Sequence, residues 1–369
     1  MRLVTTKSLK EHDILSKPLF NDNGQVLIQA GVPLTRRMID RLISLEIGYV
    51  YIEDEFTKDV QIEDTISDKT RKKAVDTIKK EFAEIANHHI IGTSLNTINL
   101  SKRFSTVIEQ ILKDIKQSDD VISILSDVYC YDSYIFTHSL NVTIYTIGLA
   151  MELKYSEKQL FEIAIGAMLH DVGKMMIPKE ILEKTGSLTK EEFDIIKKHS
   201  WAGFDVLRNA PNISLITAHC AFQHHERIDG SGYPQGLSEG DIHPYAKILA
   251  VCDVFDAVTS NRVYRKAMLP HEGLEILFGG AGKIFDKDIV ELFSRTIAIY
   301  PIGLTLYLSD GSVGVVVKQN KTFSMRPVVR VFEKDGRRIE PFEVDLLKER
   351  HITIVECEAR LAANQSASV

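Results

Sequence analysis

The stretch LFEIAIGAMLHDVGK, residues 160–174, joins an apolar segment of helical length to an adjacent histidine and aspartate. The apolar segment predicts a buried helix that ends near His170 and Asp171. One imidazole and one carboxylate are then available at that end, and the two carboxylate oxygens of Asp171 could bridge two cations. Taken alone, the pair would equally fit a helix cap or an ordinary hydrogen bond.

Segments on either side of this stretch each add one histidine. His138 lies in YDSYIFTHSLNVTIYTIG, residues 131–148, and His199 lies in EEFDIIKKHSWAGFDVL, residues 191–207, and both segments are predicted helices. The second helix has a capping-box pattern at Thr189 and Glu192, which would satisfy free backbone donors. We expect its core face to comprise Phe193, Ile196, Phe204 and Leu207. A single helical histidine is more often solvated or hydrogen-bonded than bound to a metal.

The motif HHERIDGSGYP, residues 224–234, supplies two more histidines. Consecutive helical residues point about 100° apart, so His224 and His225 could serve different cations of a close pair. The Gly and Pro residues that follow cannot continue a helix cheaply. A tight loop is therefore expected beside the two histidines.

The last segment, YAKILAVCDVFDAVTSNRVYRKA at residues 245–267, carries two aspartates on one helical face. Asp253 has apolar neighbours, and burying its carboxylate is expensive unless a cation or a donor compensates. Arg262 and Arg265 follow, and guanidinium groups suit phosphate oxygens, although a solvated helix end is the alternative.

Together these segments supply a set of donors that is too large for one cation. The candidate metal ligands are His138, His170, Asp171, His199, His224, His225 and Asp253. We expect two divalent ions, with Fe or Mn favoured and Zn, Ni or Mg as alternatives; soft Cu(I) does not fit because no Cys or Met joins the set. A pair of such ions points to phosphoester hydrolysis.

These motifs, in this order and at this spacing, closely resemble the HD-GYP subgroup of HD-domain phosphohydrolases over residues 119–300. The resemblance implies an all-helical catalytic domain that cleaves cyclic di-GMP, or in some members a related mixed dinucleotide, to a linear product. It implies that His170, Asp171, His199, His224, His225 and Asp253 bind metal, with Asp171 bridging. His138 matches an additional upstream histidine, which either completes the site or donates a hydrogen bond from behind the ligands. It also implies that Lys174 contacts the scissile phosphate and that Arg262 and Arg265 hold the substrate. Asp171 and Lys174 are the catalytic candidates.

Three positions near these motifs complete the expectations. Tyr233 and Asp256 are candidate substrate contacts, although the resemblance leaves the role of Asp256 open. Tyr134 stands four residues before His138, where members with a third metal have Glu. A phenol, with an ordinary pKa of about 10, replaces a carboxylate poorly. We therefore predict a binuclear site and a reaction that stops at the linear dinucleotide pGpG.

The fold class predicted for the whole chain is mainly α, with a small α/β module before the helical domain and a β-rich unit after it. The predicted boundaries are 1–58 for the α/β module, 59–118 for connecting helices, 119–300 for the catalytic domain, 301–358 for the β-rich unit and 359–369 for a flexible tail. The connecting helices could support a homodimer through their apolar stripe, or that stripe could pack on its own domain.

Composition limits the other function classes. The 369 residues are 44% hydrophobic and 26% charged, as in ordinary globular proteins. A net charge of −6 argues against binding of polymeric nucleic acid. Widely spaced cysteines, no signal peptide and no long apolar span predict a cytoplasmic protein that is not in a membrane.

Two functions remain as alternatives to the phosphodiesterase: a non-catalytic sensor that docks a signalling protein through the GYP loop, and a nucleotidase for another nucleotide such as cyclic GMP-AMP.

Overall fold

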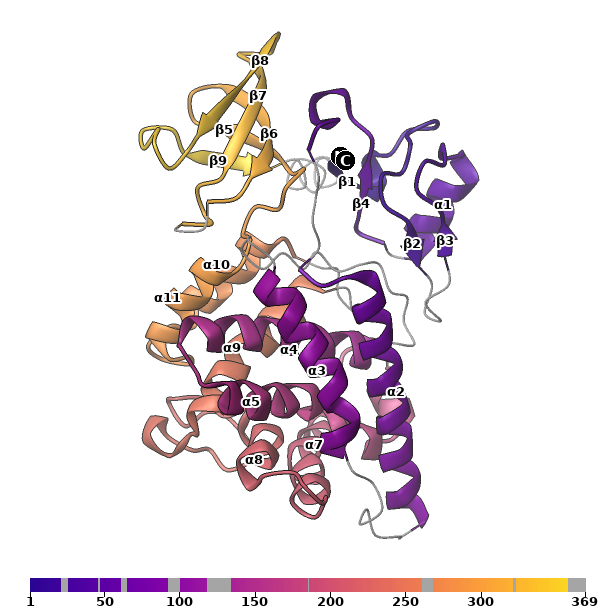
Figure 1. Ribbon diagram of the computed structural model, residues 1–369, viewed down its shortest axis with the longest axis vertical. Helices are drawn as coiled ribbons and strands as arrows, with labels where there is room; N and C mark the ends of the chain where they lie inside the picture. The colour runs from indigo at the N-terminus through magenta and orange to yellow at the C-terminus, as the bar shows by residue number, and fades with distance from the viewer. Residues whose placement is uncertain are drawn as a thin grey trace.

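The computed structural model describes residues 1–20, 26–45, 47–60, 65–91, 100–117, 134–184, 186–260, 268–320 and 323–357. A helical body forms most of the molecule, and two smaller units lie together at one end of it (Figure 1). One small unit is the N-terminal α/β module and the other is the C-terminal β-rich unit. The predicted fold class is confirmed.

The helical body is built from longer helices and a few short ones. Its long helices are α2 (Asp68–Ile91), α3 (Leu100–Gln117), α4 (Tyr134–Glu152), α5 (Glu157–Leu169), α7 (Lys190–Arg208), α8 (Leu215–Gln223), α9 (Pro244–Thr259), α10 (Pro270–Gly280) and α11 (Lys287–Thr296). Its short helices are η5 (Val172–Met176), α6 (Lys179–Leu182) and η6 (Glu239–Asp241). Within the described part of the chain, no helix combines the length and the apolarity needed to cross a membrane.

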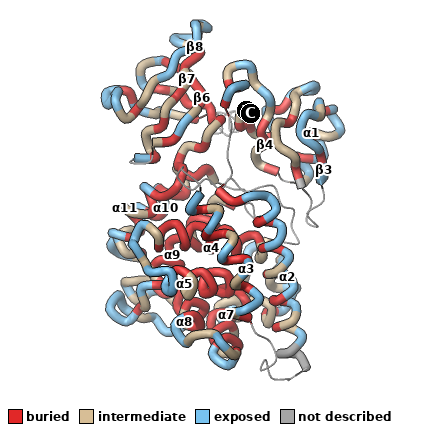
Figure 2. Tube along the Cα trace, viewed as in Figure 1, coloured by how far each residue is buried: buried red, intermediate tan, exposed pale blue. Residues whose placement is uncertain are grey.

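Local sequence signals explain where several helices of the body begin. Ser156 and Gln159 form a capping box at the start of α5. The capping box predicted at Thr189 and Glu192 is confirmed at the start of α7. Helix α4 is buried on nearly all sides from Thr137 to Ala150, which matches its lack of a polar face. The buried residues, red in Figure 2, concentrate in the middle of this body.

The connecting helices α2 and α3 contribute their apolar residues to the core of the body. Phe82 and Phe104 are fully buried there, and the ring of Phe82 meets that of Phe136 edge to face at 5.8 Å. The apolar stripe of these helices therefore packs on its own domain. A homodimer stays a prediction.

The N-terminal module contains two short antiparallel pairs and one helix. Strand β1 (Arg2–Thr5) pairs with β4 (Tyr49–Ile52), and β2 (Leu19–Phe20) pairs with β3 (Val26–Ile28). The residues between β2 and β3 lie outside the described part of the chain. Helix α1 (Arg36–Ser44) follows these strands. Short 3-10 turns complete the module: η1 (Thr6–Ser8) and η2 (Glu55–Thr57).

The C-terminal unit is a five-stranded antiparallel sheet in the order β8-β7-β6-β5-β9. Its strands are β5 (Thr305–Leu308), β6 (Ser312–Lys318), β7 (Val328–Lys334), β8 (Arg337–Asp345) and β9 (Ile354–Cys357). Two Asp-Gly pairs form its tight turns, where Gly311 and Gly336 have φ values of 79° and 74°. Glycine adopts positive φ without strain, so these turns follow directly from the sequence.

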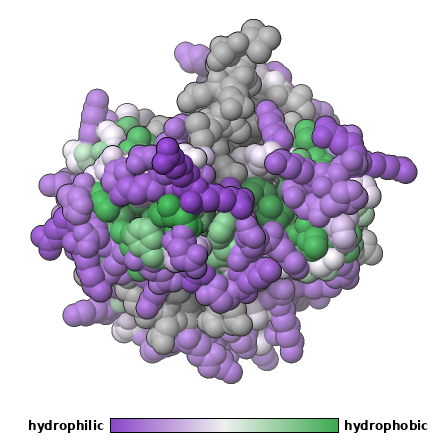
Figure 3. All heavy atoms as spheres, turned by 90° about the horizontal axis from the view of Figure 1, so that it is seen from above, coloured by the Kyte–Doolittle hydropathy of each residue, from purple (hydrophilic) through white to green (hydrophobic). Residues whose placement is uncertain are grey.

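The two small units contact each other closely. The Leu3 amide donates to the Gly303 carbonyl at 2.8 Å, and Arg330 binds both carboxylate oxygens of Asp59 at 2.6 and 2.9 Å. The rings of Phe56 and Phe332 stack with centroids 4.7 Å apart. Viewed from this end, green apolar side chains lie in a band across both units with purple polar ones around it (Figure 3). The two units therefore behave as one layer over the helical body.

Buried apolar side chains form three cores within the described residues. The largest lies in the helical body and another lies in the N-terminal module. The third joins the sheet of the β-rich unit to Leu3 and Tyr51 of the module and to Leu269 of the body. The predicted boundaries at 58, 118, 300 and 358 stay predictions, and the tail at 359–369 lies outside the described residues.

Candidate metal centre

The structure brings all seven predicted ligands together in the helical body. They are His138 on α4, His170 and Asp171 at the end of α5, His199 on α7, His224 and His225 at the end of α8, and Asp253 on α9. Six of the seven are buried, and the seventh, His225, is partly exposed. Five helices therefore converge on a single cluster of imidazole and carboxylate groups.

Asp171 lies between two pairs of histidines. Its Oδ1 atom is 3.4 Å from His199 Nε2 and 3.8 Å from His224 Nε2. Its Oδ2 atom is 3.4 Å from His170 Nε2 and 3.5 Å from His138 Nε2. Two groups of potential ligands thus share one carboxylate, and each oxygen of that carboxylate faces a different group.

Asp253 also reaches both groups. Its Oδ1 atom lies 3.1 Å from His138 Nε2, and its Oδ2 atom lies 3.6 Å from His225 Nδ1. Tyr134, where a third metal would need a carboxylate, instead stacks its ring on His138 with centroids 5.5 Å apart.

Backbone carbonyls fix the tautomers of three of the histidines. Nδ1 of His170 and Nδ1 of His199 each donate, at 2.7 Å, to the carbonyl oxygen three residues earlier. Nδ1 of His224 donates at 3.1 Å to the carbonyl oxygen four residues earlier. A carbonyl oxygen can only accept, so the proton of each neutral imidazole is on Nδ1. Each Nε2 therefore presents a lone pair to the cluster.

Asp256 orients the ring of His138 from its Nδ1 side. Its Oδ2 atom accepts the Nδ1–H of His138 at 2.7 Å, while its Oδ1 atom accepts from Asn141 at 2.9 Å and from Ser260 at 3.1 Å. The carboxylate is 1% exposed and lies at the end of the imidazole opposite to Asp171. The expectation that Asp256 contacts substrate does not fit this position, because its oxygens are already occupied behind the ring. Asn141 and Ser260 are partners that the sequence pattern did not reveal.

Burial sets the charge of most of the imidazoles. It lowers the pKa of His199 to about 4 and those of His224 and His225 well below the ordinary value, so these three are neutral at pH 7. Burial acts in the same direction on His138, but the carboxylates of Asp253 and Asp256 outweigh it and raise the pKa of His138 to about 9.

The two carboxylates of the cluster are held in the ionised form. Burial would raise the pKa of Asp171, but the positive charge of Lys174 and the nearby His170 keep it well below the ordinary value. The Lys174 ammonium lies 2.5 Å from Asp171 Oδ2. The His138 and His225 side chains lower the pKa of Asp253 in the same way, against the effect of burial.

Some buried donor atoms in the cluster lack a hydrogen-bond partner. They are Nε2 of His170 and Oδ1 of Asp171. The Nε2 atoms of His199 and His224, both bearing lone pairs, are only 3.2 Å apart. Each unsatisfied buried group costs about 1–3 kcal/mol, and facing lone pairs repel. A cation resolves both problems, and nitrogen and carboxylate donors without thiolates suit divalent metals. The residues present fit a divalent metal centre.

Gly173 determines how the His170–Asp171 pair meets α7. A Cβ atom on Gly173 would lie 2.0 Å from the His199 carbonyl oxygen and 2.5 Å from the Gly203 nitrogen. Only glycine allows η5 to pack this closely on α7. The glycine of HDVGK is therefore what brings Asp171 beside His199.

The loop after His225 is held by the buried side chain of Glu226, a residue for which the motifs predicted no role. Oε1 of Glu226 accepts the Gln235 amide at 2.8 Å, and its Oε2 accepts the Leu237 amide at 2.9 Å. This places Tyr233 beside the cluster, with its ring centroid 4.6 Å from that of His225. The signal available in the sequence was an acidic residue directly after two candidate ligands.

Two expectations about neighbouring residues have different outcomes. Phe193 does not belong to the core face of α7: its side chain is 45% exposed, and its ring lies 6.3 Å from that of Tyr233. The substrate-binding roles of Arg262 and Arg265 stay predictions because both residues lie outside the described part of the chain.

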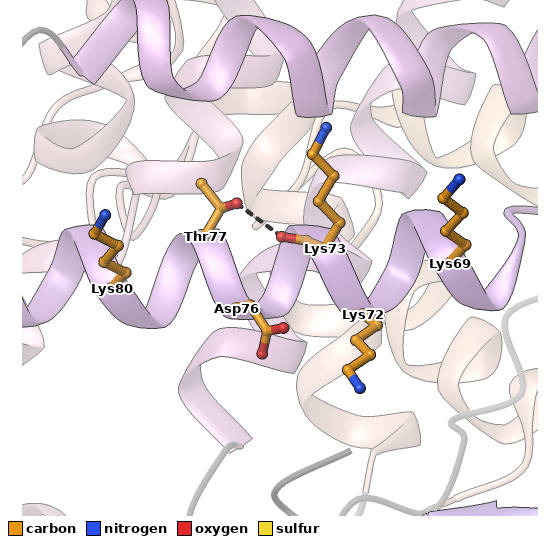
Figure 4. Close-up of a pocket in the computed structure, with 6 residues that line it drawn as sticks. All are labelled: Lys69, Lys72, Lys73, Asp76, Thr77 and Lys80. Carbon is orange, nitrogen blue, oxygen red and sulfur yellow. Dashed lines mark hydrogen bonds between the residues drawn. The ribbon is translucent and has the colours of Figure 1, made fainter. Parts of the chain in front are cut away.

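A separate pocket lies on α2 and is shown in Figure 4. It is lined by Lys69, Lys72, Lys73, Asp76, Thr77 and Lys80. Thr77 is tied to its own helix by a 2.7 Å hydrogen bond to the Lys73 carbonyl. The pocket contains no histidine and only one carboxylate, so it attracts anions but offers no metal ligand set.

Comparison with known proteins follows the same division of the chain. Residues 132–289 match the family model of an HD domain, and residues 305–363 match that of a KOW domain associated with the HD domain. PA4108 of Pseudomonas aeruginosa, a cyclic di-GMP phosphodiesterase, is 34% identical over 242 residues, which make up 66% of this chain and 57% of the relative. A cyclic di-GMP phosphodiesterase of Thermotoga maritima is 43% identical over 148 residues, 40% of each chain.

One solved structure also resembles this chain. Bd1817, an HDG"Y"P protein of Bdellovibrio bacteriovorus, aligns with a TM-score of 0.45 and 17% identity over 79% of this chain and 97% of that one. Among the sequence relatives, this chain covers less than two thirds of the length of either protein named above.

Proposed function

Because residues 132–289 of this chain belong to the HD domain family, in its HD-GYP form, we propose that the protein is a metal-dependent phosphodiesterase that hydrolyses cyclic di-GMP. The observation that carries the proposal is the position of Asp171, which offers one oxygen to each of two histidine groups. A shared carboxylate at this position is what a two-metal phosphoesterase requires.

The ligand set divides at Asp171. We assign His199, His224 and His225 with Oδ1 of Asp171 to one cation, and His138, His170 and Asp253 with Oδ2 to the other. Two divalent cations bound there would activate a water molecule for attack on phosphorus and stabilise the charge that develops on the phosphoryl group. Fe or Mn is favoured, with Zn, Ni or Mg as alternatives.

The side chains around the ligands orient the reaction. Lys174 places a positive charge beside Asp171, where it can neutralise a phosphoryl oxygen. The fixed tautomers of His170, His199 and His224 keep the lone pairs aimed at the centre without reorganisation. Arg262 and Arg265 are proposed to hold the phosphates of the substrate, since guanidinium groups bind phosphate in a bidentate manner.

Tyr134 favours a binuclear centre over a trinuclear one. Its ring stacks on His138 at the position where a third metal would need a carboxylate. We therefore expect two metals per chain and pGpG as the product. Three tightly bound metals per chain would contradict this part of the proposal.

The proposed function is tested by anaerobic purification and elemental analysis, followed by chromatographic identification of the product formed from cyclic di-GMP. Asp171→Ala should abolish turnover and leave the helical content unchanged, because the apolar residues of α5 specify that helix. Asp205→Ala is the matched control, since Asp205 is a carboxylate of α7 that pairs with Arg208 at 2.6 Å and is no part of the cluster. An active Asp171→Ala protein with normal metal content would overturn the mechanism.

The rival functions differ in measurable ways. A cyclic-dinucleotide sensor acting through the GYP loop would bind cyclic di-GMP without turning it over, and a related nucleotidase would prefer cyclic GMP-AMP. The complete set of ligands favours catalysis over sensing, because a sensor does not need the lone pairs of His170, His199 and His224 aimed at one centre. A substrate panel that includes both cyclic dinucleotides separates these functions.

A further inference from the structure

An exposed phenylalanine lies next to the candidate metal centre. Phe193 is 45% exposed on α7, although its spacing in the sequence predicts a core residue. A single exposed apolar side chain is ordinary on a protein surface. The surroundings of Phe193 make this one informative.

The Phe193 ring is the outer member of a row of rings that leads to the cluster. Its centroid lies 6.3 Å from that of Tyr233, with the two planes at 82°. Tyr233 in turn lies 4.6 Å from the ring of His225 and 6.4 Å from that of His199. Tyr233 therefore separates Phe193 from the metal ligands by the width of one ring.

A basic group accompanies the Phe193 ring. The Lys197 ammonium lies 5.3 Å from the Phe193 ring centroid, and it is paired with Asp194 at 2.5 Å. Trp201 on the same helix offers a contrast. It is 53% exposed, but its ring meets Phe204 and Phe222 and not the residues of the cluster.

We propose that Phe193, supported by Tyr233, forms a subsite that stacks on a nucleobase of the substrate. The inference rests on the proposed function, because it takes the phosphate of a dinucleotide to lie at the metal centre. In a nucleotide the ribose separates the phosphate from the base, so the base binds one sugar's width away from the phosphate. Phe193 lies beyond Tyr233, which is itself in ring contact with His225 and His199.

Physical chemistry favours a base as the ligand of this ring. Every nucleobase has an apolar π-face, and stacking on an aromatic side chain changes affinity about 5- to 100-fold. The exposed part of the Phe193 ring is an available surface for such a contact.

The test compares Phe193→Ala, Phe193→Leu and Phe193→Trp in the full, metal-loaded chain, with Trp201→Ala as the matched control. Steady-state kinetics with cyclic di-GMP give KM and kcat, and calorimetry gives the affinities for cyclic di-GMP and GMP. We expect Ala and Leu to raise KM and to weaken binding by at least about fivefold, with kcat nearly unchanged. Trp should retain affinity because it keeps a flat ring, and Trp201→Ala should match the wild type.

Two results would overturn the subsite. One is an unchanged KM and affinity in Phe193→Ala. The other is full rescue by Leu, which would indicate a general apolar contact without stacking. Unfolding is not a competing explanation, because melting temperature and metal content are measured on every variant and the side chain is largely exposed.

The binding measurements also separate this inference from the proposed function. Wild-type protein that binds cyclic di-GMP without hydrolysing it would refute the phosphodiesterase, while the comparison of affinities would still decide the role of Phe193. Wild-type protein that binds neither nucleotide would refute the subsite as well.

Discussion

Replacement of Asp256 by asparagine is the sharpest test of how His138 is prepared for a metal. Asp256 accepts three hydrogen bonds, from His138, Asn141 and Ser260, at 2.7, 2.9 and 3.1 Å. An amide has one accepting oxygen and one donating NH₂ group in place of two oxygens. Whichever way the amide turns, its NH₂ group meets a donor.

The variant Asp256→Asn therefore has two possible responses. If its NH₂ group faces His138, the imidazole must move its proton to Nε2 and lose the lone pair that faces Asp171. If its NH₂ group faces Asn141 and Ser260, those two donors lose their acceptor in a buried site. The first response weakens metal binding, and the second weakens the fold.

The magnitude follows from these contacts. Loss of the partner that orients a metal-binding histidine lowers metal affinity about 10- to 100-fold, which corresponds to about 1.4–2.7 kcal/mol. Unsatisfied buried donors add about 1–3 kcal/mol of lost folding stability. We therefore expect Asp256→Asn to hold substoichiometric metal after dialysis and to unfold at a lower temperature than the wild type.

Elemental analysis and competition with a chelator measure the loss of metal, and thermal unfolding measures the loss of stability. Asp114→Asn is the matched control, because Asp114 accepts from Thr70 and Gln110, both at 2.7 Å, far from any candidate ligand. It should lower stability and leave metal content unchanged. Full metal content and unchanged affinity in Asp256→Asn would refute the orienting role.

Three further predictions concern other parts of the chain. Gly173→Ala places a methyl group 2.0 Å from a carbonyl oxygen of α7. We therefore expect unfolding experiments to show a free energy of unfolding lower by about 3 kcal/mol or more, together with a lower metal content. Gly240→Ala is the control and should have no effect, because no atom lies within 4 Å of the added methyl group. Glu226→Gln removes one of the two acceptor oxygens that hold the GYP loop, which weakens the hold on the loop by about 1–3 kcal/mol. We therefore expect kcat/KM to fall while the metal content stays constant. An unchanged kcat/KM would contradict this role of Glu226. Hydrogen bonding to Arg330 lowers the pKa of Asp59 to about 2 from 3.8, so this pair stabilises the fold above pH 3.8 and the contribution disappears as the pH falls through 2. Thermal unfolding should therefore show a steeper loss of stability over that range in the wild type than in Asp59→Asn, and parallel curves would contradict the pair's role.

The helices and the ligand set could be predicted from the sequence because both signals are local. Each candidate ligand lies in or directly after an apolar segment of helical length, so the same residues that specify a helix also place its ligand. The capping box at Thr189 and Glu192 was equally local, and it was found in the structure.

The supporting contacts could not be predicted because they join distant segments. Asp256 and His138 are 118 positions apart, and no spacing rule connects them. The prediction that Phe193 belongs to the core was wrong for a different reason. It lies six residues before His199, about 240° around the helix, so a helix that turns His199 inward carries Phe193 toward its outer side. Apolar character alone does not determine which face of a helix is buried.

A net charge also conceals the local distribution of charge. The chain carries −6 overall, yet four lysines line one side of α2 around a single carboxylate. No ion pair to these four lysines occurs among the described residues. The overall charge therefore predicts the average field of the protein but does not describe this surface.

The metal centre places a thermodynamic demand on the fold around it. Nε2 of His170 and Oδ1 of Asp171 are buried without hydrogen-bond partners, and each costs about 1–3 kcal/mol, so together they oppose folding by a substantial part of the stability of a typical domain. The apolar core of the helical body must offset this cost whenever the metal is absent. Capping boxes at α5 and α7 and the close packing at Gly173 form without any ion, since they depend on backbone and side-chain contacts alone. The geometry of the centre is thus set by the fold in advance, and a cation that binds only the folded state adds its binding free energy to that stability.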